Sequence, residues 1–172
     1  MDTTTMGKKK KEPSVAGKGL KILIAGLGNL LLRDDGVGVH AVRSMNCRRP
    51  RSRGVRVVEV GTAVLDALHL FEWADKILAI DAMRAGGSPG TLYSFGVSEV
   101  EDPPQASLHE LGLLSALRFL AEGKRPPVVI LGVEPAVIDY GLDLSPEVQS
   151  ALPGLTQSVR KMVDAWQRGS LK

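Results

Sequence analysis

The stretch Lys21-Ile-Leu-Ile-Ala-Gly-Leu-Gly-Asn-Leu-Leu-Leu-Arg-Asp-Asp-Gly-Val-Gly-Val-His40 decides the fold. Residues 22–25 are continuously apolar without a helical period, which is typical of a strand covered on both faces. The glycines that follow permit a tight turn, and the adjacent aspartates Asp34 and Asp35 mark a helix start. The stretch therefore predicts a buried strand, a glycine turn and a helix, and we expect the function to reside here.

Composition favours one domain without a nucleic-acid partner. The chain has 172 residues, 44% of them hydrophobic, which suffices for one sizeable core. Residues 1–20 hold five lysines and two acids, so the remainder, with 17 basic and 17 acidic groups, is about neutral. We predict a disordered Lys-rich tail over residues 1–19 and a single α/β domain over residues 20–172. A neutral domain with 4% aromatic residues is a poor partner for nucleic acid.

The cysteine count and the length of the apolar runs indicate where in the cell the protein is expected. Cys47 is the only cysteine, which excludes an intramolecular disulfide and a cysteine-cluster metal site, and fits a reducing environment. No apolar stretch follows the lysine run, and none reaches the roughly 20 residues of a membrane span. We therefore expect a cytoplasmic protein with no membrane partner.

Beyond the opening stretch, strand and helix patterns alternate. Strands are expected at residues 55–60, 76–80, 91–95 and 127–133, and helices at 34–45, 62–73, 108–123 and 146–167. This alternation predicts a three-layer α/β/α sandwich with a mostly parallel five-stranded sheet, to which the strand at 91–95 could add an antiparallel edge.

Several local expectations are open to test. Asp34 or Asp35 should cap the first helix, Ser107 should cap the helix at 108–123, and Pro153-Gly154 should kink or restart the last helix. The helix at 62–73 should bury an apolar face, made of Val64, Leu65, Leu68 and either Leu70 or Phe71.

The candidate site lies at the carboxyl ends of the strands, where open α/β sheets bind ligands. Asp34 and Asp35 follow the first strand, Asp81 ends the third, and His109 opens a helix. Two carboxylates and an imidazole with open positions suit a borderline divalent ion such as nickel, zinc, manganese or iron. Each residue also has a structural alternative: helix capping for the paired aspartates, a hydrogen bond to a neighbouring loop for Asp81, and plain surface exposure for His109.

Other features weigh less. His40 could face the same rim or merely cover its helix, and His69 is interpreted as structural. Dinucleotide binding is disfavoured, because Leu31 stands where a third glycine would be needed and acids follow where phosphates would bind.

A series of short motifs runs through the chain after the tail. In order they are Gly26-Leu-Gly-Asn29, Asp34-Asp35-Gly-x-Gly38, Gly61-Thr62, Ile80-Asp81-Ala82, Pro89-Gly90-Thr91, His109-Glu-Leu-Gly112 and Gly132-Val-Glu-Pro135. Each motif alone is weak, but the ordered combination resembles the endopeptidases that mature the large subunit of nickel-iron hydrogenases.

This resemblance implies an activity and a set of residues. The activity is removal of the C-terminal extension of the hydrogenase large-subunit precursor after nickel insertion. The metal-binding and catalytic residues would be Asp35, Asp81 and His109, with the nickel supplied by the precursor. These residues would engage that nickel and align the scissile peptide for attack by a metal-activated water. Some family members have Glu at the first position, and Asp35 is one methylene shorter.

The same resemblance assigns the glycine turn a role in substrate approach. An extended substrate would pass over a set of small or polar residues, namely Gly26, Gly28, Asn29, Asp34, Gly36 and Gly38. Two rivals remain at this point. A nickel-recognition or assembly factor would keep the three metal-binding residues and cut nothing. A peptidyl-tRNA hydrolase shares Gly-Leu-Gly-Asn, but its Pro-Gly is replaced here by Leu30-Leu31.

Overall fold

A computed structural model describes residues 19–46, 53–96, 108–121 and 123–169, with the backbone alone described for residues 108–111. The predictions for the Lys-rich tail, for Cys47 and for the Ser107 cap lie outside the described residues.

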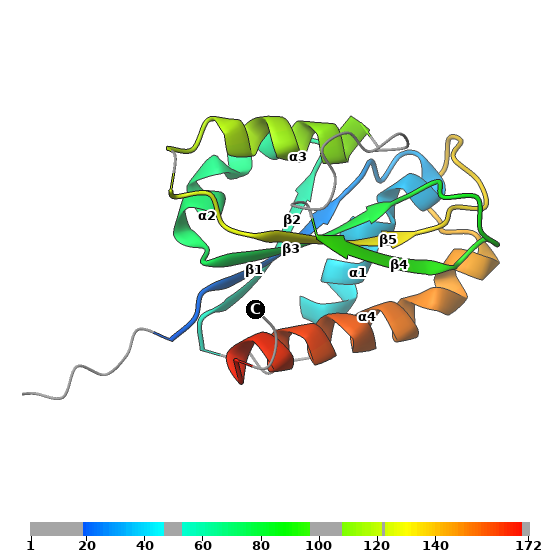
Figure 1. Cartoon of the computed structure of the whole chain (residues 1–172). Helices are drawn as coiled ribbons and strands as arrows, with labels where there is room; N and C mark the ends of the chain where they lie inside the picture. The colour runs from blue at the N-terminus through cyan, green and yellow to red at the C-terminus, as the bar shows by residue number, and fades with distance from the viewer. Residues whose placement is uncertain (1–18, 47–52, 97–107, 122, 170–172) are drawn as a thin grey trace, which may run out of the picture.

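The core of the protein is a five-stranded sheet in the order β2-β1-β3-β5-β4 (Figure 1). The strands β1 (Ile22–Leu27), β2 (Val55–Gly61), β3 (Lys76–Ala82) and β5 (Val128–Val133) run parallel. The outer strand β4 (Leu92–Gly96) is antiparallel to β5. The predicted mixed sheet is thus confirmed, including its antiparallel edge.

Helices cover both faces of this sheet, so the predicted three layers are present (Figure 1). One face carries α1 (Val37–Asn46) and α4 (Pro146–Gln167). The other carries the 3₁₀ turn η2 (Val64–Ala67), α2 (Leu68–Trp73) and α3 (Leu108–Arg118). Every residue of β1 is buried, because its alternate side chains enter the two cores. No helix in the described parts of the chain is long and apolar enough to cross a membrane.

The structure differs from the predicted helices at two places. Residues 64–67 form a 3₁₀ turn instead of an α-helix, so inward positions recur after three residues. Val64 and Ala67 are therefore buried, followed by Phe71, while Leu65 is 58% exposed. The restart expected at Pro153 does not occur, because α4 is one helix of 22 residues. Buried side chains on both sides of the proline, Val148 and Leu155 among them, hold α4 on the sheet.

Close glycine packing fixes where α1 begins. A Cβ on Gly38 would overlap the carbonyl oxygen of Ile80, and a Cβ on Gly26 would overlap that of Gly38. The first turn of α1 therefore rests directly on β1 and β3, which no larger residue would allow. β2 is added on one side of β1 and β3 on the other, so the strand order reverses between β1 and β3. A crevice is expected outside the carboxyl ends of these two strands, as in flavodoxin-like sheets.

Candidate active site

Asp81 lies on β3, one of the two strands at the switch point. It is the penultimate residue of β3, has no exposed surface, and accepts a hydrogen bond at Oδ1 from the N–H of Ala82 at 3.0 Å. A buried carboxylate is costly unless polar groups or a cation compensate its charge. Asp81 therefore has the chemistry of a site residue at the end of a buried strand.

Asp35 lies in the 3₁₀ turn η1 (Arg33–Gly36), which contacts β3. Its Oδ2 accepts a hydrogen bond from the N–H of Asn29 at 2.8 Å, so the carboxylate is tied to the turn after β1. Gly28 has φ +107°, and a Cβ there would overlap the carbonyl oxygen of Asp35. The glycine turn thus holds Asp35 at the same rim as Asp81.

Asp34 faces away from this rim, into the protein. It has no exposed surface and accepts from three backbone N–H groups, that of Ser145 at 2.7 Å and those of Ala136 and Val137 at 2.9 Å. Burial raises the pKa of Asp34, but these hydrogen bonds outweigh it and leave the pKa below its usual value. The capping prediction was wrong, since Leu32 holds the N-cap position of η1 without a side-chain bond.

Most of the expected substrate-approach residues are enclosed by the protein. Asp34 and the four glycines are buried, and atoms of this chain lie where the side chains of Gly26, Gly28, Gly36 and Gly38 would be. Packing therefore explains these glycines, and both carboxylate oxygens of Asp34 are already bonded to backbone N–H groups. Gly28 and the half-buried Asn29 also line a pocket.

The histidines are placed to different degrees. His109 is the second residue of α3, as predicted, but its side chain lies outside the description. Among the described residues, no group of three His, Cys, Asp or Glu side chains is spaced to hold a metal ion. His40 lies half-buried on α1, and its Nε2 has no hydrogen-bond partner within the described parts. His69 contacts the carbonyl oxygen of Asp66 through Nδ1 at 3.0 Å, in line with a structural role.

Glu134 is a residue whose role the sequence did not reveal. It is 7% exposed, and its Oε2 accepts from the N–H groups of Ala85 at 2.8 Å and Gly87 at 3.2 Å, and from the hydroxyl of Tyr93 at 2.8 Å. Burial raises the pKa of Glu134, but these bonds outweigh it and lower the pKa overall. Burial and the nearby carboxylate raise the pKa of Tyr93. Glu134 therefore anchors the loop that follows Asp81.

Replacing Glu134 by Gln should loosen this loop. All three bonds end on Oε2, so an amide oxygen can take that place, but it lacks the negative charge that strengthens the bonds. We therefore expect the free energy of unfolding at pH 7 to fall by about 1–2 kcal/mol. Because the folded pKa is lowered, the carboxylate stabilises the fold above about pH 4 and loses that effect as the pH falls through the folded value. Urea unfolding over a series of pH values below 7 should show a difference in stability between wild type and variant that shrinks as the pH falls. The exposed Glu72→Gln serves as control, and a difference that stays constant throughout the acid range would contradict this account.

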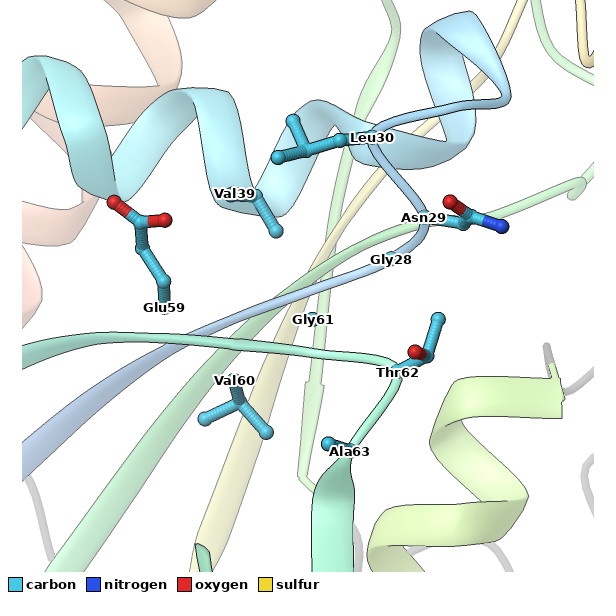
Figure 2. A pocket seen from close by; sticks show the side chains of 9 residues that line it. All are labelled: Gly28, Asn29, Leu30, Val39, Glu59, Val60, Gly61, Thr62 and Ala63. Atoms are coloured by element: carbon cyan, nitrogen blue, oxygen red, sulfur yellow. The ribbon is translucent and has the colours of Figure 1, made fainter. Parts of the chain in front are cut away.

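An open pocket lies between the diverging ends of β1 and β2 (Figure 2). Its volume is about 320 Å³. The lining comes from the turn after β1, from α1 and from the end of β2, and consists of Gly28, Asn29, Leu30, Val39, Glu59, Val60, Gly61, Thr62 and Ala63.

The fold and its acidic rim define a class of α/β proteins that act at the switch point of a mostly parallel sheet. A family model described as hydrogenase maturation protease matches residues 39–162. The hydrogenase 2 maturation protease of Escherichia coli is 32% identical over 145 residues, covering 80% of this chain and 88% of its own length. The hydrogenase expression/formation protein HupM of Azotobacter chroococcum is 34% identical, covering 80% and 69%.

Solved structures agree with the sequence matches. The hydrogenase maturating endopeptidase HybD from E. coli aligns with a TM-score of 0.75 at 25% identity, covering 87% of this chain and 94% of its own. The HybD protease from Thermococcus kodakarensis aligns with a TM-score of 0.71 at 27% identity, covering 83% and 99%. The chain belongs to the hydrogenase maturation protease family. It is therefore a peptide hydrolase, which sets aside the peptidyl-tRNA hydrolase and the non-proteolytic factor.

Proposed function

We propose that this endopeptidase removes the C-terminal extension of a nickel-iron hydrogenase large-subunit precursor once nickel has been inserted. The observation that carries the proposal is the pair of carboxylates, Asp35 and Asp81, held at one rim by backbone N–H groups in a member of this protease family. The single cysteine supports a reducing compartment, so we infer that the reaction takes place in the cytoplasm.

The donor chemistry of the rim suits the nickel carried by the precursor. Carboxylate oxygens and an imidazole nitrogen bind borderline divalent ions, and Asp35, Asp81 and His109 would supply them. Because the precursor brings the ion, it acts as part of the substrate. The hydrogen bonds to Asn29 and Ala82 restrict the two carboxylates before substrate arrives, which lowers the entropy cost of aligning the scissile peptide.

A cleavage assay with two forms of the precursor tests this proposal. Nickel-loaded and nickel-free precursor are incubated with the protein, and loss of a C-terminal peptide is followed by gel shift and mass spectrometry. We expect cleavage of the loaded form alone. Equal cleavage of both forms would contradict nickel recognition, and no cleavage of either would contradict the proposed substrate.

A further inference from the structure

We propose that the pocket between β1 and β2 is a subsite that receives one uncharged side chain of the precursor, close to the scissile peptide. This inference rests on the proposed function. It gives a role to the Gly61-Thr62 motif, which the carboxylate rim leaves unexplained.

The pocket exists because β1 and β2 diverge at a β-bulge. Gly26 pairs with Glu59, but Leu27 pairs with Gly61, so Val60 is an extra residue on β2. Such bulges redirect a strand and often lie beside active sites. The N–H of Gly28 still donates to the carbonyl oxygen of Gly61 at 3.3 Å, so the two chains remain hydrogen-bonded at the point where they begin to diverge.

Gly61 leaves space in the pocket, unlike the two glycines packed at the first turn of α1, and its φ of +60° also favours glycine. A Cβ on Gly26 or Gly38 would overlap backbone atoms, whereas a Cβ on Gly61 would meet only the carbonyl oxygen of Gly28, at 3.6 Å, among the described residues. Figure 2 shows Gly28 and Gly61 in the middle of the hollow, with Leu30 and Val39 on one side and Thr62 and Ala63 on the other. The space beside Gly61 is therefore large enough for a side chain and is not filled by other atoms of the described residues.

The pocket adjoins the candidate active site through one residue. Asn29 lines the pocket, and its N–H donates to Asp35 Oδ2 at 2.8 Å. Its own Oδ1 accepts from the N–H of Leu31 at 3.0 Å, which fixes the turn. Since an extended chain advances about 3.3 Å per residue, a side chain in the pocket belongs to a residue within a few positions of the peptide held at Asp35.

The lining defines which side chain fits. Glu59, the one charged residue that lines the pocket, is paired with Arg43 through Nε at 3.0 Å and Nη2 at 2.9 Å. The other lining residues are uncharged, so the lining carries no unmatched charge, which favours an uncharged side chain. A volume of about 320 Å³ is at the lower end for small-molecule pockets and suits a medium-sized side chain with its flanking backbone.

Filling the pocket from its rim tests the inference. Ala63 is exposed and lines the pocket, so Ala63→Trp adds bulk there without crowding the core. We expect kcat/KM for the nickel-loaded precursor to fall roughly 10- to 100-fold, with an unchanged midpoint of urea unfolding. Leu65→Trp is the matched control, because Leu65 is 58% exposed on the 3₁₀ turn that follows Ala63, lies outside the pocket lining and should keep wild-type kinetics.

A compensation experiment identifies the occupant. Residues on both sides of the precursor's cleavage point are replaced one at a time by Gly, and each precursor is offered to wild type and Ala63→Trp. At one position, the Gly replacement should lower kcat/KM of the wild type. At the same position it should reduce the difference in kcat/KM between wild type and Ala63→Trp. The subsite is refuted if Ala63→Trp cleaves the natural precursor at the wild-type rate, or if no Gly replacement reduces the difference in kcat/KM between the two proteins. Either result leaves the protease activity of wild type in place. If wild type itself leaves the loaded precursor intact, the proposed function fails.

Discussion

Replacing Asp81 by Asn should lower kcat/KM for the nickel-loaded precursor at least about a hundredfold, without unfolding the protein. Asparagine has the same shape, and its amide oxygen can still accept the bond from the Ala82 N–H at the end of β3. The substitution therefore removes the negative charge and leaves the strand in place. Because Asp81 has no exposed surface, its charge acts in a medium of low polarity, where attraction to a cation is strong.

The cleavage assay should be accompanied by a measurement of nickel-dependent association. If Asp81 engages the nickel of the precursor, Asp81→Asn should weaken binding to the loaded form and leave binding to the nickel-free form unchanged. Asp66→Asn, an exposed aspartate on η2, is the charge-matched control and should behave as wild type. Cleavage by Asp81→Asn at the wild-type rate would remove Asp81 from the site.

Replacing the neighbouring Asp34 by Asn should act on the fold. The carboxylate accepts three backbone bonds, and an amide presents N–H groups toward at least one of these donors. We expect a loss of about 2–4 kcal/mol in the free energy of unfolding at pH 7, measured by urea denaturation. Activity should fall as well, because η1 carries both Asp34 and Asp35.

Acid should erase the difference between wild type and Asp34→Asn. The folded pKa of Asp34 is lowered, so its stabilising effect is complete above about pH 4 and disappears as the pH falls through the folded value. Asp143→Asn changes an exposed aspartate two residues before Ser145, a partner of Asp34. It should leave the free energy of unfolding close to that of wild type, both at pH 7 and in acid. An Asp34→Asn protein as stable as wild type at pH 7 would show that the three bonds contribute nothing.

The strands were predictable because their apolar runs report burial directly. β1, β5 and residues 77–80 of β3 are uninterrupted apolar segments in the middle of the sheet, where both faces are covered. The 3₁₀ turns at residues 33–36 and 64–67 were missed, since a period of three over four residues is hard to distinguish from the start of an α-helix.

The candidate site was predictable only where its residues follow strands. Asp35 and Asp81 were candidates because they end or follow apolar runs, and their roles in the site stay a prediction. The roles of Asp34 and Glu134 were not predictable, because their partners are distant in the chain. Asp34 binds the N–H of Ser145 across 111 positions, and Glu134 binds that of Ala85 across 49. Their backbone partners carry no side-chain signal in the sequence.

The opposite orientations of Asp34 and Asp35 also constrain the length of the chain. The carboxylate of Asp34 is buried inside the protein, and that of Asp35 lies at the rim. Which aspartate takes which position therefore depends on the number of residues between it and Gly28. Inserting or deleting a single residue within 30–33 would bring a different side chain to the position of the inner aspartate. The length of this turn is therefore a feature to preserve in any engineered version of this protease.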